Sequence, residues 1–184
     1  QVNSDSGLVY YNMEDPVVGG YTPDRIALRR AINLAQDMDT EIRTIRRGQA
    51  IPAQSPVSPN LYGYDPAFKS ENSTYDPARA KALLDMYGYV DRDGDGWRDL
   101  PDGKPLVIVR STQPEQVNRE FDTLWKKNLD AIGIKTTFNV GKWAEQLKSA
   151  RAGKLQVWSL SSSAADPDGQ GAFQRFHGPQ AGSQ

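Results

Sequence analysis

Apolar residues recur with helical or strand spacing over most of the chain, and the alternation between these spacings predicts its elements. Helical spacing, with apolar side chains three or four positions apart, occurs in five stretches: residues 23–35, 39–48, 77–87, 117–132 and 143–150. Strand-like runs occur in three: residues 106–109, 134–140 and 155–160. The second half therefore alternates strand and helix, which predicts an α/β fold with two βαβ units and a small mixed sheet flanked by helices.

The first fifty residues are predicted to be mainly helical. Thr22 offers a capping hydroxyl just before Pro23, a residue that suits the first position of a helix. Residues 49–74 follow neither spacing and contain four prolines. An irregular run of this length is uncommon inside a compact domain and is usually functional or packed against a neighbour. We therefore expect residues 49–74 to border a site or a partner.

Composition excludes several classes of protein. A length of 184 residues favours a single domain over 1–184, and no apolar stretch reaches the roughly 18 residues of a membrane span. Basic residues number 22 and acidic residues 23, with the two signs interleaved, so nucleic acid is not an expected partner. Cysteine is absent, which excludes thiol catalysis and thiolate metal sites. The start at Gln1 and the polar end lead us to expect part of a longer protein.

The run DRDGDGWRDLPD, residues 91–102, has the spacing of a calcium-binding loop, with a glycine at its sixth position. Its candidate ligands are Asp91, Asp93, Asp95, Trp97, Asp99 and Asp102. The twelfth position is an aspartate where the pattern prefers glutamate, and Pro101 prevents a helix from starting there. The alternative is a turn whose aspartates hydrogen-bond their own backbone. Calcium is thus a possible ligand, and no cofactor is required.

The carboxyl ends of the predicted strands are the expected place for a ligand site, as in other open α/β sheets. Residues 161–169 follow the last strand and combine hydroxyls, carboxylates and free backbone amides. The candidates by position are Ser161, Ser162, Ser163, Asp166 and Asp168. The alternative for this run is a capped turn leading into a helix near 170–176. A hydrolase built on His177, the only histidine, is disfavoured because that residue lies in a polar tail.

Several motifs in order resemble one protein family. They are Asn12 to Pro16, RRAINLAQDMDTEI from Arg29, Arg47 to Ala50, Tyr75 to Pro77, Asp93 to Arg98, Ile132 to Ile134, and Ala152-Gly153 before the last strand, with Trp125, Asn128 and Trp143 between them. Together they are similar to the family 5 extracellular solute-binding proteins, the peptide- and nickel-binding components of bacterial ABC importers. The resemblance covers nearly the whole chain.

This resemblance implies a two-lobed binding protein that traps a solute between its lobes. The chain would supply most of the C-terminal lobe, with the N-terminal lobe of the same protein absent. The resemblance further implies a protein without enzymatic activity, located in the periplasm or otherwise outside the cytoplasm. It would deliver an oligopeptide or similar small solute to ABC permease subunits and associate with the membrane through that transporter. An autonomous calcium-binding module is the alternative.

In peptide-binding members, a Trp-x-Ala-Asp segment after the last strand offers its aspartate to the peptide's amino group. By resemblance, the tryptophan position falls on Ser162 and the aspartate position on Ala165, while Asp166 comes one residue late. A shift of one residue moves a carboxylate by several ångströms. Either Asp166 substitutes, or the solute lacks a free amino terminus and is less charged.

Overall fold

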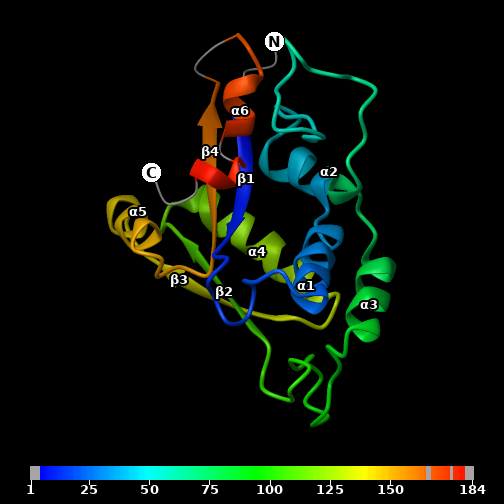
Figure 1. The fold of residues 1–184 in the computed structure, drawn as a ribbon. Coiled ribbons are helices and arrows are strands. Elements are labelled where there is room, and N and C mark those ends of the chain that lie inside the picture. The colour runs from blue at the N-terminus through cyan, green and yellow to red at the C-terminus, as the bar shows by residue number, and fades with distance from the viewer. Residues whose placement is uncertain (1–4, 165–166, 175, 181–184) are drawn as a thin grey trace.

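A four-stranded sheet forms the centre of the computed structural model, which describes residues 5–164, 167–174 and 176–180 (Figure 1). Its strands are β1 (Asp5–Tyr11), β2 (Val107–Thr112), β3 (Lys135–Val140) and β4 (Val157–Ser163), in the order β1-β4-β2-β3. The central strand β2 runs parallel to β3 and β4, while β1 pairs antiparallel with β4. The sheet is therefore small and mixed, which confirms the predicted fold class.

Helices occupy all five stretches with helical spacing. The helical elements are α1 (Pro23–Leu34), α2 (Met38–Thr40), the π-helical turn η1 (Glu41–Ile45), η2 (Glu71–Ser73), α3 (Pro77–Met86), α4 (Gln116–Asp130), α5 (Trp143–Arg151), α6 (Gln170–Gln174) and η3 (Gly178–Gln180). Thr22 is the N-cap of α1 and Pro23 opens the helix, as predicted, but the predicted capping hydrogen bond is wrong, because the Thr22 side chain makes none. The Thr22 hydroxyl instead hydrogen-bonds Asp24 and holds the pKa of that carboxyl below its ordinary value.

The hydrophobic core lies on one face of the sheet, under α1, α3 and α4. Ile108 of β2, Val157 of β4 and Ile134, which directly precedes β3, are fully buried there. Helix α1 contributes Leu28 and Ile32, and the other helices contribute Leu84, Trp125 and Leu129. Side chains alternate along a strand, so Trp158 and Leu160 of β4 lie on the opposite face, against α5.

Two parts of the sheet differ from the prediction. Strand β1 lies in the region predicted to be mainly helical, and residues 161–163 extend β4 instead of forming a loop. Both differences have one cause, since β1 and β4 pair along seven residues each, from Asp5 opposite Ser163 to Tyr11 opposite Val157. Each strand depends on a partner about 150 residues away, which local spacing does not show.

Residues 49–74 are irregular apart from η2, as predicted. The segment is attached to the chain after β4 by two backbone hydrogen bonds: Tyr62 N–H donates to Pro167 O at 2.8 Å, and Gly169 N–H donates to Tyr62 O at 2.9 Å. Gly169 is buried, and a side chain there would meet Val57 and the Tyr62 carbonyl. These contacts hold the long segment beside the end of β4.

The acidic loop connects α3 to β2, giving the predicted order of helix, turn and strand. It lies at the end of the molecule opposite α6 (Figure 1). The Arg98 guanidinium ties the acidic loop to the rest of the fold, because it donates hydrogen bonds to Ile132 O at 2.7 Å and to Tyr89 O at 2.6 Å. Among the described residues, no helix has the length and apolar character that crossing a membrane requires.

Candidate functional site

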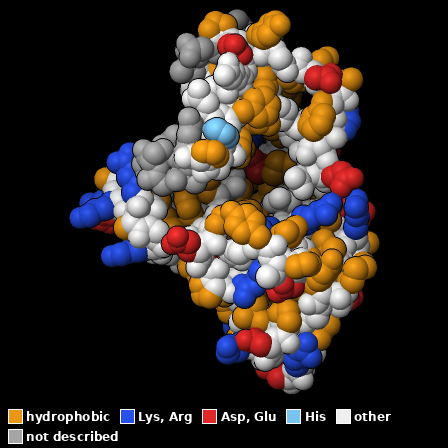
Figure 2. Space-filling view, in the orientation of Figure 1, with side chains coloured by type: hydrophobic (Ala, Val, Ile, Leu, Met, Phe, Trp, Pro, Cys, Tyr) orange, Lys and Arg blue, Asp and Glu red, His pale blue; other side chains and the backbone are white. Residues whose placement is uncertain are grey.

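An open groove of about 1150 Å³ lies beside the sheet, on the same face as the core. Figure 2 shows this face of the molecule deeply hollowed near its middle. The groove is lined by the carboxyl ends of β2 and β4, the start of β1, the region of α2 and η1, part of the irregular segment and α4. The irregular segment therefore borders the groove, in agreement with the expectation that it adjoins a site.

A buried ion pair lies in the groove wall. Arg110 near the end of β2 approaches Asp122 of α4, with 3.6 Å between Nε and Oδ1, and the two side chains are only 11% and 13% exposed. The Arg110 guanidinium also donates to the Ser159 hydroxyl at 3.0 Å and stacks on the Trp125 ring at 4.2 Å. The arginine is thus held from several sides, and its charge is compensated inside the protein.

Burial sets the protonation behaviour of this wall. It lowers the pKa of Arg110, although Asp122 opposes the shift. It raises the pKa of Asp122, against the lowering effects of a hydrogen bond from Thr112 and of Arg110. Burial also raises the pKa of Tyr11, whose hydroxyl donates to Asn33 Oδ1 at 3.1 Å.

A second ion pair also lines the groove. Arg46 Nε lies 2.7 Å from Glu41 Oε1, and the Arg46 guanidinium lies over the Phe121 ring at 5.0 Å. Among the described groove residues, Asp5 is the one charged side chain outside these two pairs, and it accepts a hydrogen bond from the Ser163 hydroxyl. This part of the wall therefore presents no unpaired positive charge.

The predicted ligand residues occupy different positions. Ser161 lines the groove from the end of β4. Ser163 is exposed and bonds Asp5, and Ser162 pairs with Ser6 along the same strand. Asp168 accepts from the Gln170 N–H at 2.9 Å at the start of α6, as in the alternative of a capped turn. Ala165 and Asp166 lie outside the described residues, so ligand contact by this set stays a prediction.

Arg110 and Asp122 are not among the site residues that the sequence predicted, although one signal for the pair is present in it. Arg110 directly follows the apolar run of residues 106–109. A charged group in a buried strand needs a partner, and the next helix along the chain contains acidic residues, among them Asp122. The sequence alone does not show that the pair faces a groove.

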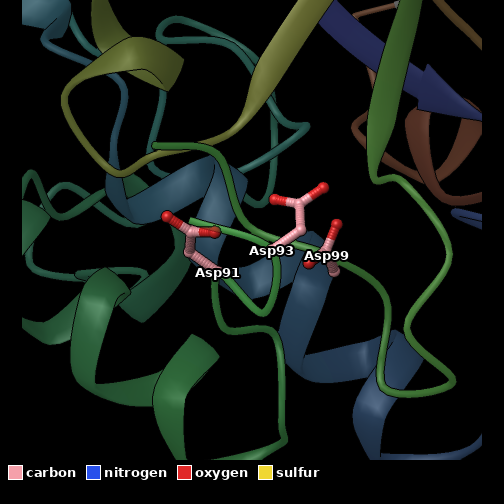
Figure 3. Close-up of side chains that lie close together, drawn as sticks. All are labelled: Asp91, Asp93 and Asp99. Atoms are coloured by element: carbon pink, nitrogen blue, oxygen red, sulfur yellow. The ribbon is translucent and has the colours of Figure 1, made fainter. Parts of the chain in front are cut away.

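Three of the six predicted calcium positions converge. The carboxylates of Asp91, Asp93 and Asp99 lie together in the loop (Figure 3), with one oxygen from each within 4.8 Å of the others. Gly94 and Gly96 adopt positive φ angles of 79° and 91°, which permits the sharp turn.

The carboxylates of the loop also bond their own backbone. Asp91 accepts from the Gly94 and Gly96 amides at 2.7 and 2.9 Å, and Asp95 accepts from the Trp97 amide at 2.8 Å. Asp102 pairs with Lys104 at 3.0 Å and is not part of the cluster. The turn alternative accounts for these contacts, and calcium binding stays a prediction.

His177 is exposed on the surface (pale blue in Figure 2). Within the described part of the chain, its imidazole has no hydrogen bond to a serine or an aspartate, so the geometry contains no assembled Ser-His-Asp arrangement around it.

Comparison with known proteins places this fold in a known group. Residues 2–184 match the family described as bacterial extracellular solute-binding proteins, family 5 middle. Heme-binding protein A of Haemophilus influenzae is 28% identical over 148 residues, which are 79% of this chain and 25% of that protein. Di/tripeptide-binding protein 2 of Pseudomonas aeruginosa is 32% identical over 143 residues, 77% of this chain and 25% of that protein.

The fold is also found in solved structures. The oligopeptide-binding protein AppA of Bacillus subtilis, in complex with a nonapeptide, superposes with a TM-score of 0.79 at 19% identity, covering 90% of this chain and 32% of AppA. The chain spans about a quarter of the length of the curated relatives it matches. These relatives are named as binding proteins.

Proposed function

Because the chain belongs to the bacterial extracellular solute-binding proteins of family 5, we propose that it forms one wall of the solute-binding cleft in the binding component of an ABC importer. The groove beside β2 and β4 carries this proposal. It lies where open α/β sheets bind ligands, at the carboxyl ends of parallel strands. Its volume of about 1150 Å³ suits a small solute and exceeds a typical single-ligand pocket.

The proposed whole protein has two lobes, of which this chain is most of the C-terminal one. The second lobe of the same protein would cover the open side of the groove when the lobes close. A solute that touches both lobes only in the closed form favours that form by its differential affinity. The closed protein would then dock on permease subunits at the outer side of the cytoplasmic membrane.

The proposed solute is an oligopeptide or similar small molecule. The names of the relatives point to peptides and heme as solutes of those proteins. In this chain the groove charges are paired internally, with Arg110 in an ion pair with Asp122 and Arg46 in one with Glu41. This wall therefore favours an uncharged part of a solute, such as a peptide backbone held by the hydroxyls of Ser159 and Ser161.

Native mass spectrometry of the full-length protein, purified from the envelope fraction of its own host, tests the proposal. We expect a mass well above 20.4 kDa and a bound peptide or small molecule that dissociates on activation. A Ser161→Tyr variant places a bulky ring in the groove wall and should lose this bound molecule, whereas the remote control Lys104→Ala should keep it. A stand-alone chain near 20.4 kDa without a bound solute would contradict the proposal.

Catalysis is not part of the proposed function. A hydrolase acting through a serine and His177 would be labelled by serine-reactive probes, because such probes need an activated hydroxyl. We expect no labelling of the full-length protein. Labelling that disappears in a His177→Ala variant would instead favour the hydrolase.

A calcium-binding loop is a second proposal, favoured by the convergence of Asp91, Asp93 and Asp99. If the loop binds calcium, the melting temperature should rise with calcium and not with magnesium, because the smaller ion requires a stricter octahedral geometry. An Asp93→Asn variant should lose this rise, while Asp102→Asn should retain it, since Asp102 lies outside the cluster. Equal melting temperatures with and without calcium would leave the loop as a turn.

A further inference from the structure

A small void lies between α5 and the sheet, on the face opposite the core. Its volume is about 10 Å³, close to the minimum that a single water molecule needs. The void is lined by residues of α5, β2 and β4, among them Gln146 and Trp158. Because it shares Ser111, Trp143 and Ser159 with the wall of the groove, it is a side pocket of the groove.

Two residues that line this void each carry a buried polar atom with no hydrogen-bond partner within the described part of the chain: Gln146 Oε1 and Trp158 Nε1. The Gln146 side chain belongs to a residue that is only 6% exposed. Carbonyl oxygen is an acceptor, and an indole N–H is a donor. Buried polar groups are nearly always hydrogen-bonded, so these two atoms call for an occupant that both donates and accepts.

Neighbouring contacts hold both side chains in place. Gln146 Nε2 donates to Asn139 O at 3.0 Å, which fixes the amide plane and leaves Oε1 for another donor. The Trp158 ring is stacked on Tyr10, with 5.8 Å between the ring centres. Gly141 leaves room for the amide, since an added Cβ there would come within 2.7 Å of Gln146 Nε2. The two side chains that carry the unpaired atoms are therefore held in place by their neighbours.

We propose that the void is a subsite for one hydroxyl-type oxygen, which donates to Gln146 Oε1 and accepts from Trp158 Nε1. A hydroxyl oxygen matches both the size of the void and its pair of partners. The oxygen comes from water in the solute-free protein or from a hydroxyl of a solute in the groove. The second source rests on the proposed function, and the first does not.

A high-resolution crystal structure of the full-length protein without added solute tests the subsite. We expect one ordered oxygen within hydrogen-bonding distance, about 2.7–3.2 Å, of both atoms. The Gln146→Met variant removes the acceptor while keeping similar volume, and it should lose this oxygen. The matched control is Gln116→Met, at an exposed position of α4 away from the void, and it should keep the ordered oxygen. An empty void in the unaltered protein would overturn the proposal.

A crystal structure with a bound threonyl peptide, together with affinities for threonyl and valyl peptides of equal length, separates the two sources of oxygen. If a threonine hydroxyl enters the void, the water is displaced, and the Gln146→Met variant should lose at least about tenfold in affinity for the threonyl peptide alone. If the water stays while peptide is bound, water is the source. Absence of peptide binding would count against the proposed function and leave the crystallographic test of the subsite unaffected.

The indole of Trp158 gives a readout that does not depend on crystals. A long-lived bound oxygen should protect its N–H from exchange with solvent, whereas the half-exposed Trp97 indole should exchange quickly. A Trp158→Phe variant assigns the signal. Rapid exchange of the Trp158 indole proton, at the rate of the Trp97 indole, would contradict the presence of a held oxygen.

Discussion

At the scale of single residues, the Arg110 and Asp122 pair connects the stability of the protein to its groove. Both side chains are nearly buried, and removal of one partner leaves the other charge uncompensated. Asp122→Asn should therefore cost about 3 kcal/mol of unfolding free energy, measured by urea denaturation. The double variant Arg110→Met with Asp122→Leu should recover most of this loss, because it removes both charges.

The control for this pair is an exposed one. Glu71→Gln breaks the ion pair between Arg30 and Glu71, in which the side chains are 47% and 72% exposed, respectively. This change should leave the denaturation midpoint nearly unchanged. If Asp122→Asn were equally neutral, the buried pair would not be compensating a charge in the groove wall.

Asp37 gives the fold a pH-dependent contribution at the start of α2. Its carboxylate accepts hydrogen bonds from the Thr40 N–H and hydroxyl at 2.9 and 2.7 Å. Burial by itself raises the pKa of Asp37, but these bonds together with the charges of Arg43 and Lys127 outweigh it and lower that pKa. A lowered pKa means that the stabilisation is complete above the unfolded value of about 4 and is lost as the pH falls through the folded value.

Substitution of Asp37 separates the cap from its charge. Asp37→Ala should cost about 1 kcal/mol at neutral pH, and the difference from the unaltered protein should shrink in strongly acidic solution. Asp37→Asn keeps a capping oxygen, so its stability at neutral pH should be close to that of the unaltered protein. Its stability should also depend less on pH. Thermal melting across this pH range measures both, and an Asp37→Ala deficit that stays constant with pH would exclude the linkage.

At the scale of elements, the irregular segment between η1 and α3 depends on a close approach of backbones at Gly169. An added Cβ there would come within 2.7 Å of Val57 Cγ1 and 2.8 Å of the Tyr62 carbonyl oxygen. Gly169→Ala should therefore cost about 1–3 kcal/mol, as overpacking does, and should loosen residues 58–64 beside the groove. Limited proteolysis within that segment measures the loosening.

Gly171→Ala is the matched control for this change, since an added Cβ at Gly171 meets nothing within 4 Å. Both glycines lie around the start of α6, so a general effect on that helix would alter both variants. Equal proteolysis of the two variants would show that the contact between Gly169 and Tyr62 does not hold the segment.

Elements built from local signals could be predicted from the sequence, and elements built from distant pairing could not. Helix α3 follows from local chemistry, because the Asp76 carboxylate accepts a hydrogen bond from the Arg79 N–H at 2.9 Å and Pro77 opens the first turn. Strand β1 has no comparable signal, since β4 stabilises it from the other end of the chain. Ser161 at the end of β4 was predicted as a site residue and lines the groove. The rest of the sheet and helix wall could not be predicted, because it joins Arg110 to Asp122 and Val9 to Ser159 only in the folded molecule.

At the scale of the whole molecule, the open groove implies that affinity depends on a second wall. The described wall pairs its own charges and presents hydroxyl groups and aromatic rings to one side of the groove. Under the proposed function, a closed pair of lobes would contact the solute from both sides. The isolated 184-residue chain should therefore bind the co-purifying solute at least about tenfold more weakly than the full-length protein, a difference of about 1.4 kcal/mol.

Titration calorimetry of the two proteins with that solute measures this difference. Circular dichroism of the isolated chain provides the control, because a loss of affinity is informative only if its helices and sheet are retained. The Ser161→Tyr variant of the full-length protein should reduce affinity although its second lobe is intact, which separates loss of this wall from loss of the other. Equal affinity of the folded isolated chain and the full-length protein would mean that one wall suffices, and closure between lobes would then contribute nothing to capture of the solute.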